Sequence, residues 1–338
     1  MRALLSTAGE RIELSCGRRS LSAVLEEGTA GELLPAGPGP VDIRVTVEDT
    51  TQAFDTSGWE PLTRGAWRSS GRVLVQDACS SGLDVLVTAD DDLLDVRARW
   101  RPSASVRAAD VVLRSRSRLL QREVLLQYPA LWWASRKGRA PLHASVCTLG
   151  RDEAARTVMI AGPGGVGKST LIQAELSAGA RCTCDNLCTS DGRTAWGVVE
   201  PMRVQDDSRL PFASGGRRMP HGRRETPWPS RTASLIPDML VVLRRGISDT
   251  PVVRPLDPEP AARVLVTGTY MAGELRRYWQ YASTLALGTG VGAAHAAVEK
   301  VAGALAAQLP CREVVLARAP GIRLADLLDA KDEMEVTR

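Results

Sequence analysis

The residues best suited to chemistry in this sequence form one glycine-rich stretch, GPGGVGKST, at positions 162–170. It fits the pattern G-x-x-x-x-G-K-[ST], in which backbone N–H groups of a turn surround phosphate oxygens, the lysine reaches the terminal phosphates and the hydroxyl reaches Mg²⁺. The apolar run 158–161 precedes it, and apolar residues at helical spacing follow it. We therefore predict a strand, a phosphate-binding loop and a helix, with Lys168 on phosphate and Ser169 on Mg²⁺. The predicted ligand contacts are Gly162, Gly164, Gly165, Val166, Gly167, Lys168, Ser169 and Thr170.

The elements that must position this loop are expected between residues 116 and 320. Hydrophobic runs predict strands at 142–149, 158–161, 180–185, 239–243 and 314–317, and helical spacing predicts helices near 272–285 and 291–309. The arginine-rich segment 213–232 holds three prolines, which disfavour a helix, and we expect a mobile loop there. Residues 321–338 are assigned to a C-terminal tail, whose charged end, 329–338, is expected to be frayed.

The residues before 116 show a different hydrophobic pattern. Alternating apolar and polar residues predict short strands at 41–47, 72–75, 83–87 and 94–100, separated by turn residues, and together these favour an antiparallel meander. A helical segment, 118–135, follows and is expected to be interrupted at Pro129. The sequence thus predicts a smaller, mainly β domain over 1–115 in front of the α/β domain.

Composition excludes several classes of protein. The net charge is only +4, and acidic and basic residues are mixed along the chain, so the protein has no large positive potential that would attract a polyanion. We therefore expect no nucleic-acid partner. No apolar run approaches the length of a membrane span, and the first residues lack the apolar core of a signal peptide. The seven cysteines are irregularly spaced, which favours a reducing, cytoplasmic location. Cys182, Cys184 and Cys188 lack a paired second cluster for zinc, so we interpret them as small apolar side chains in strands.

Two common classes of phosphate-loop protein do not fit the sequence. A Ras-like GTPase needs an N-K-x-D element after the loop, and the chain has none. A transporter ATPase needs a signature loop and an acidic strand end. The segment 213–220 with the strand 239–243 superficially offers both, but prolines follow the glycines and the strand ends in Arg244 and Arg245 instead of carboxylates.

The order of motifs resembles the catalytic domain of the HPr kinase/phosphorylase family. His143-Ala-Ser, a short hairpin, the glycine-rich loop, Gly179 and then Asp185-Asn186 follow one another as that family's histidine, loop, glycine and Asp-Asp pair do. The similarity extends over about residues 118–319 and includes the segment 237–243. It implies an α/β fold of the type shared with phosphoenolpyruvate carboxykinase over 116–320. It also implies transfer of phosphate from ATP, with Mg²⁺, to a hydroxyl.

Carried over residue by residue, the resemblance implies three catalytic residues. Lys168 contacts phosphate, Asp185 takes the proton of the attacking hydroxyl, and His143 orients Asp185. A carboxylate at the end of a strand beside the phosphate loop suits this role on chemical grounds too. Asp185 could instead be a cap or turn residue, and His143 a core histidine. Glu200 has two interpretations of equal weight: it is a second Mg²⁺-directed carboxylate, or it lies at a solvated strand end.

The sequence departs from the family's pattern at Asn186, which stands where the second acid is expected. This weakens the case for a second metal contact and for the reverse, phosphorylase-type reaction. The family's relatives include kinases of peptide precursors in natural-product pathways. The leading hypothesis is therefore an ATP-dependent kinase of a Ser or Thr hydroxyl in a peptide or protein. The alternatives are a kinase of a small hydroxylated metabolite and a nucleotide-binding regulator without catalysis, and a homo-oligomer stays open.

Overall fold

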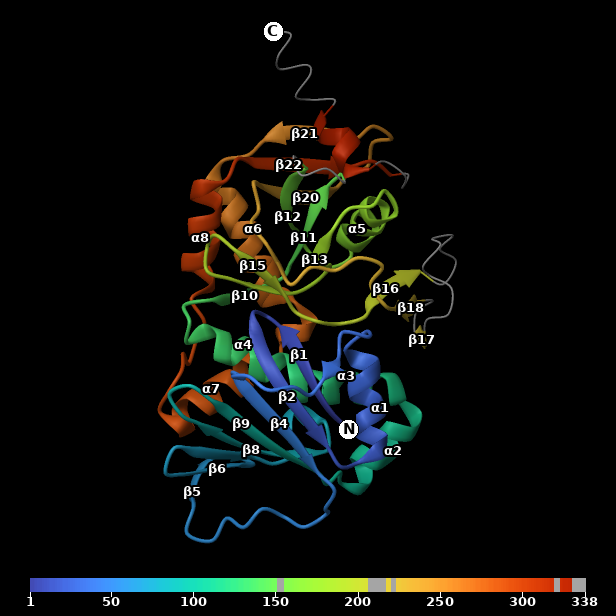
Figure 1. Ribbon diagram of the computed structural model, residues 1–338. Coiled ribbons are helices and arrows are strands. Elements are labelled where there is room, and N and C mark those ends of the chain that lie inside the picture. The colour runs from blue at the N-terminus through green and yellow to red at the C-terminus, as the bar shows by residue number, and fades with distance from the viewer. Residues whose placement is uncertain (151–154, 206–216, 220–222, 319–322, 330–338) are drawn as a thin grey trace. The chain divides into compact units, whose positions relative to one another are not determined.

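The structure is a computed structural model of the 338-residue chain, and it describes all residues except 151–154, 206–216, 220–222, 319–322 and 330–338 (Figure 1). The chain forms two compact units. The first unit holds Met1–Gly138, Val199–Pro201 and Glu274–Ala296, and the second holds Arg139–Val198, Met202–Gly273 and Ala297–Arg338. The first unit therefore extends beyond the expected domain boundary at residue 115 and takes in two later segments.

The first unit is built on a nine-stranded sheet with the order β3-β1-β2-β4-β9-β8-β7-β6-β5. The strands are β1 (Arg2–Thr7), β2 (Glu10–Cys16), β3 (Leu34–Pro35), β4 (Ile43–Glu48), β5 (Glu60–Thr63), β6 (Ala66–Ser69), β7 (Arg72–Val75), β8 (Leu83–Ala89) and β9 (Leu94–Trp100). Apolar residues of the central strands, such as Ile12, Val45 and Val96, are fully buried, while the alternate positions are more exposed. This alternation is the pattern from which β4, β7, β8 and β9 were predicted.

The expected antiparallel meander is correct for part of this sheet and wrong for the rest. Strands β5 to β9 pair antiparallel in chain order, but β4 lies parallel to both β2 and β9. Parallel neighbours need a crossover connection, and the helix α1 (Arg19–Gly28) lies between β2 and β4 in the chain. The prediction missed β1, β2 and α1, and it did not include the parallel pairing of β4 with β2 and β9.

The helical segment after β9 is longer than expected and passes through its proline. It consists of α2 (Ala104–Val112), α3 (Arg114–Arg122), the π-helical turn η2 (Glu123–Gln127) and α4 (Tyr128–Ser135). Pro129 does not interrupt the helix; it lies in the first turn of α4, directly after the π-helical turn η2, where the hydrogen-bond pattern of the helix changes. The helix α4 packs on β2, β4 and β9, and α7 (Tyr278–Thr289) packs on β5 to β8. These contacts explain why the segment belongs to the first unit.

The second unit contains a six-stranded sheet, β13-β11-β12-β20-β22-β21, and two smaller sheets, β10-β14-β15-β19 and β16-β18-β17. The strands of the large sheet are β11 (Ala144–Leu149), β12 (Arg156–Ala161), β13 (Cys182–Cys184), β20 (Met239–Arg245), β21 (Val252–Pro255) and β22 (Cys311–Leu316). The other strands are β10 (Ala140–Leu142), β14 (Cys188–Ser190), β15 (Ala195–Gly197), β16 (Met202–Gln205), β17 (Arg217–Met219), β18 (Arg223–Thr226) and β19 (Ser234–Leu235). Strands β12, β20 and β22 are parallel, which makes the unit a mixed α/β structure.

Helices lie on both sides of the six-stranded sheet. Figure 1 shows α5 (Lys168–Ser177) on one side of the sheet and α6 (Pro258–Met271) and α8 (Val298–Gln308) on the other. Alternate residues of β12 and β20, including Val158, Ile160 and Val241, form one apolar cluster with α5. The helix at 324–329, which falls in the predicted C-terminal tail, contributes the buried Leu324 and Leu328 to the same cluster. The charged residues beyond it, 330–338, lie outside the described part of the chain.

Several expected elements differ in their limits. The strand predicted at 142–149 is two strands in two sheets, β10 and β11, with His143 between them. The helix predicted near 272–285 corresponds to the short turn η3 (Gly273–Leu275) and the first part of α7, and α6 ends before it at Met271. Within the expected loop 213–232, β17 and β18 form an antiparallel pair. The rest of that expectation falls partly on residues 213–216 and 220–222, which lie outside the described residues.

Candidate active site

Strand register in the six-stranded sheet brings the predicted catalytic residues to one edge. Strand β11 is antiparallel to both β12 and β13, with Ala144 opposite Ala161 and Val146 opposite Cys184. The start of β11 therefore lies beside the ends of β12 and β13. His143 directly precedes β11, the glycine-rich loop follows β12, and Asp185 follows β13. Segments distant in sequence thus meet where the parallel strands end, which is the common place for ligand sites in α/β sheets.

The glycine-rich loop has the backbone that its sequence predicts. Gly162, Gly165 and Gly167 have φ angles of 155°, 76° and 121°, which side-chain-bearing residues rarely adopt. Gly162 is also crowded, because an added Cβ would lie 3.0 Å from the carbonyl oxygen of Leu243. At Gly164 and Gly165, by contrast, an added Cβ would meet no atom within 4 Å. The turn is therefore fixed at its base and open at its tip, a form that suits a phosphate group.

Lys168 begins α5 and is buried, with 6% of its surface exposed. Its Nζ donates to the carbonyl oxygens of Gly162, at 2.7 Å, and Pro163, at 3.2 Å. The ammonium group is thus held inside the loop, where a bound phosphate would meet it at the N-terminus of a helix. Ser169 is half-buried beside it and Thr170 is exposed. The loop fits a nucleotide polyphosphate with its metal ion, and the ligand roles of its residues remain predictions.

The position of His143 is set by α6, a helix that the sequence analysis did not find. The backbone N–H of His143 donates to Thr269 Oγ1 at 3.0 Å, and that hydroxyl donates to the carbonyl oxygen of Leu265 at 2.7 Å. Thr269 is fully buried. One residue earlier, an added Cβ at Gly268 would lie 3.5 Å from the Gly162 carbonyl oxygen. Helix α6 therefore contacts the histidine and the base of the phosphate loop together.

The imidazole of His143 contacts Asn186. The distance from Nε2 to Asn186 Oδ1 is 3.0 Å, and His143 is 5% exposed. Asn186 was noted in the sequence as a missing acid, so its contact with the histidine is new information. Its position next to Asp185 in the motif could have identified Asn186 as a residue of the site. The proposed orientation of Asp185 by His143 stays a prediction.

Asp185 is held by its backbone in a crowded part of the unit. It is 5% exposed, and its carbonyl oxygen accepts a hydrogen bond of 2.6 Å from Ser145 Oγ. Strand β13, just before it, packs closely on β15, because an added Cβ at Gly197 would lie 2.1 Å from the Thr183 carbonyl oxygen. No larger side chain fits there without moving the backbone. The strand that carries Asp185 is therefore rigidly located, as a catalytic carboxylate requires.

The three clustered cysteines lie in strands, as expected. Cys182 and Cys184 are in β13, Cys188 is in β14, and all three are buried. Burial raises the pKa of Cys182, and the Cys184 thiol beside it raises the pKa of Cys188. Within the described residues, no group of three or more histidine, cysteine or acidic side chains is placed to hold a metal ion.

Glu200 belongs to a different part of the structure. It lies in the segment Val199–Pro201 of the first unit and is 4% exposed. The preceding residue, Val199, donates its N–H to Thr7 Oγ1 at 2.8 Å. Its buried position differs from the solvated strand end that the sequence left open, and a role on Mg²⁺ stays a prediction.

Comparison with known proteins gives distant structural matches and no sequence match. No protein-family model matches the chain, and the curated proteins gave no match either. A solved structure of the HPr(Ser) kinase/phosphatase from Coxiella burnetii is similar over 58% of this chain and 93% of its own, at 13% identity and a TM-score of 0.28. That score is too low to carry a conclusion about the site, so the function is argued below from the residues. No described helix is both long and apolar enough to cross a membrane.

Proposed function

We propose that the chain is an ATP-dependent phosphotransferase that moves the γ-phosphate to a hydroxyl, foremost a Ser or Thr hydroxyl of a peptide or protein. The observation that carries the proposal is the shared sheet edge. A glycine loop with a buried lysine follows β12, and a buried aspartate follows β13, beside the start of β11. A loop that only bound nucleotide would need no carboxylate at this edge. Phosphoryl transfer to an alcohol needs one.

In the proposed reaction, the acceptor hydroxyl attacks the γ-phosphorus of ATP, the bond to the β-phosphate oxygen breaks, and ADP leaves. Asp185 takes the hydroxyl proton. Lys168 and the loop N–H groups hold the phosphates, and Ser169 would hold Mg²⁺, which neutralises charge on the phosphates. His143 would position this group of residues, itself fixed by Thr269 and Asn186.

The test separates nucleotide binding from transfer. The parent protein is incubated with Mg-ATP and a randomised library of Ser- and Thr-containing peptides, and mass spectrometry follows the gain of one phosphoryl group. Asp185→Asn should bind Mg-ATP like the parent but transfer phosphate roughly 10²- to 10⁴-fold more slowly, the range for loss of a general base. Asp191→Asn, an exposed turn residue in the same region, is the matched control.

Two outcomes would contradict the proposal. Full transfer by Asp185→Asn would show that Asp185 is not the base. Mg-ATP binding by the parent with no transfer to peptides or to a panel of hydroxylated metabolites would favour a regulator. Phosphorylation of metabolites alone would reassign the acceptor.

The reverse reaction is tested with the same proteins. Because Asn186 replaces an acid, we expect the parent to remove little phosphate from phosphopeptide in the presence of inorganic phosphate. The Asn186→Asp variant, which restores that acid, is compared with the parent in the same assay. Efficient dephosphorylation by the parent would show that Asn186 does not limit the reaction to one direction.

A further inference from the structure

An arginine pair ends strand β20, at the edge of the six-stranded sheet where the glycine-rich loop lies. Arg244 and Arg245 are the last two residues of β20, and both are exposed. Strands β12 and β20 are parallel, with Ala161 opposite Val242, so both strands end at the same edge. The proposed function gives these arginines no role, although positive charge beside a phosphate-binding loop affects what the loop binds.

The two arginines differ in their partners. Arg244 forms an ion pair with Glu313, a buried residue of β22 that also pairs with Arg254. Arg245, by contrast, makes no ion pair with any residue in the described part of the chain. The charge of Arg244 is therefore balanced within the protein, whereas the charge of Arg245 is available for a ligand.

The two arginines also lie on different faces of the sheet, because neighbouring residues of a strand point to opposite faces. Leu243, two residues before Arg245, belongs to the apolar cluster that α5 covers. Arg245 therefore lies on the same face as α5, the helix that begins with Lys168 directly after the loop. Arg244 lies on the opposite face, with Glu313.

The loop contacts the neighbours of Arg245 in two directions. An added Cβ at Gly162 would lie 3.0 Å from the carbonyl oxygen of Leu243, and one at Gly167 would lie 3.0 Å from Leu316 Cδ1. Leu316 is the partner of Arg245 in the neighbouring strand β22. The first and last glycines of the loop thus contact residues beside Arg245, along its own strand and across the sheet. From this position the long arginine side chain can reach a phosphate in the loop.

The backbone that carries Arg245 is closely held against β22. The N–H of Gly246, the next residue, donates to the carbonyl oxygen of Leu316 at 2.9 Å. An added Cβ at Gly246 would lie 2.7 Å from the same oxygen, so the two strands approach each other closely here. The strand end therefore presents the Arg245 side chain from a fixed point.

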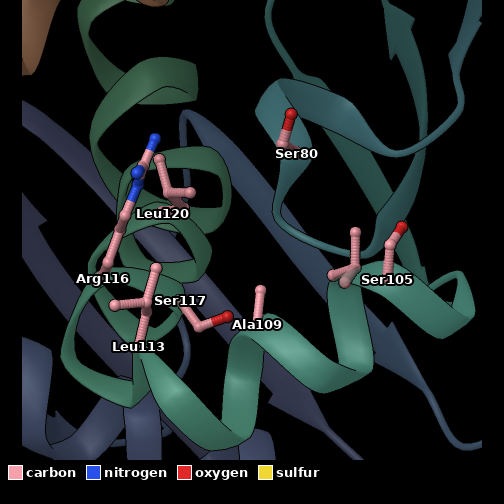
Figure 2. Close-up of a pocket in the computed structure, with 8 residues that line it drawn as sticks. Ser80, Ser105, Ala109, Leu113, Arg116, Ser117 and Leu120 are labelled. Carbon is pink, nitrogen blue, oxygen red and sulfur yellow. The ribbon is translucent and has the colours of Figure 1, made fainter.

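An exposed arginine does not make a ligand site by itself, as Arg116 in the first unit illustrates. Arg116 lines a groove of about 300 Å³ between α2 and α3. Figure 2 shows its guanidinium and the Ser117 hydroxyl pointing in different directions, so this wall offers no common polar end for an anion. Arg245 differs because the loop that contacts its neighbours has itself the form of an anion site.

We propose that the Arg245 guanidinium binds the terminal phosphate of a nucleoside triphosphate held in the glycine-rich loop, so that the protein distinguishes a triphosphate from a diphosphate. This inference rests on the proposed function, since it needs a nucleotide in the loop. A guanidinium can donate two parallel hydrogen bonds to phosphate oxygens. In phosphate-loop NTPases a strand-end carboxylate helps to hold Mg²⁺. A cation at the end of β20 suits direct contact with phosphate instead.

Calorimetry of nucleotide binding tests the inference without any phosphate transfer. The parent and its variants are titrated, with Mg²⁺ present, with ADP and with AMP-PNP, a triphosphate analogue that resists hydrolysis. Arg245→Gln should weaken AMP-PNP binding roughly tenfold to a hundredfold, as for the loss of hydrogen bonds between charged groups, and ADP binding by less than about threefold. Arg245→Lys keeps the charge but loses the fork of donors, so its AMP-PNP affinity should lie between those of the parent and Arg245→Gln.

Arg244→Gln is the matched control, because it removes the same charge from the opposite face. It should weaken the binding of both nucleotides by less than about threefold. Circular dichroism checks that each variant is folded. The ratio of the two affinities separates a phosphate contact from a structural effect, since a disturbed loop would weaken the binding of both nucleotides.

Equal losses of AMP-PNP and ADP affinity in Arg245→Gln, or no loss of either, would overturn the inference. A parent protein that binds neither nucleotide would overturn it together with the proposed function. A parent that binds both nucleotides but transfers no phosphate would contradict the phosphotransferase proposal alone, and the ratio of affinities would still decide the role of Arg245.

Discussion

The two large sheets differ in the polar residues at their strand ends. In the nine-stranded sheet, charged side chains pair across strands on the exposed face, where Glu13 lies between Arg2 and Arg44, and Glu48 between Arg97 and Arg99. The six-stranded sheet has similar pairs from Glu313 to Arg244 and Arg254, but at the edge beside the glycine-rich loop its polar side chains are buried and bond to backbone atoms, as Lys168 and Ser145 do. Paired surface charges satisfy each other, whereas buried groups held by the backbone keep their chemistry available for a ligand. The second arrangement marks the candidate active site.

The largest expected effect in this comparison comes from removing a buried charge of the second unit. Lys168→Ala should abolish stabilisation by Mg-ATP, which for the parent is about 2.7 kcal/mol at a nucleotide concentration a hundredfold above Kd. Thermal unfolding with and without Mg-ATP measures it, with Lys300→Ala on an exposed face of α8 as control.

The same variant should also affect the protein without nucleotide. An exposed loop lysine would leave the unliganded protein unchanged, but Lys168 is buried and bonded to two loop carbonyls. Lys168→Ala should therefore lower the melting temperature without nucleotide as well. A variant that gained as much from Mg-ATP as the parent would show that Lys168 does not bind phosphate.

An intermediate effect is expected at the buried hydroxyl behind the site. Thr269→Val keeps the shape of the side chain but leaves the His143 N–H without its acceptor, which should cost about 1–3 kcal/mol in the free energy of unfolding. Thr267→Val, on an exposed position of α6 whose hydroxyl also bonds to its own helix, should change stability by less than about 0.5 kcal/mol. Urea denaturation of both variants measures the difference. Equal values would mean that the His143 contact adds nothing to stability.

The smallest effect is expected on the exposed face of the first unit. Glu13→Gln should cost only about 0.2–1 kcal/mol, the usual value for surface ion pairs, and less in 1 M salt. Hydrogen bonds from Arg2 and Arg44 hold the pKa of Glu13 below its ordinary value of 4.5. A lowered pKa in the folded state stabilises the protein above the unfolded value, and this contribution is lost as the pH falls through the folded pKa.

Denaturation of the parent and of Glu13→Gln at pH 7 and at pH 3 checks the direction of this pH dependence. The difference in stability should be present at pH 7 and shrink at pH 3. Glu26→Gln is the control, since Glu26 is exposed and has no ion pair within the described residues. A cost at Glu13 as large as that at Thr269 would remove the distinction between the two sheets.

Local patterns in the sequence predicted the elements that depend on neighbouring residues. Alternation predicted β7, β8 and β9, and the glycine-rich loop with its flanking strand and helix was predicted closely. Signals were weakest where long-range contacts decide the structure. The break at His143 between β10 and β11 places these strands in different sheets, and the run of apolar residues around it gives no sign of that. Helix α6 has Pro258 and Pro260 in its first turn and follows a polar stretch, and no helix was predicted there.

What the sequence determined by itself is the backbone of the glycine-rich loop, because the positive φ angles that it needs are available to glycines and its lysine and hydroxyl follow at fixed spacing. The tertiary structure alone decided which residues lie beside this loop. The antiparallel pairing of β11 with β12 and β13 brings His143 and Asp185 to its edge, and α6 brings Thr269 to His143 across 126 residues of chain. Such pairings depend on which buried surfaces fit together, and no local pattern records them.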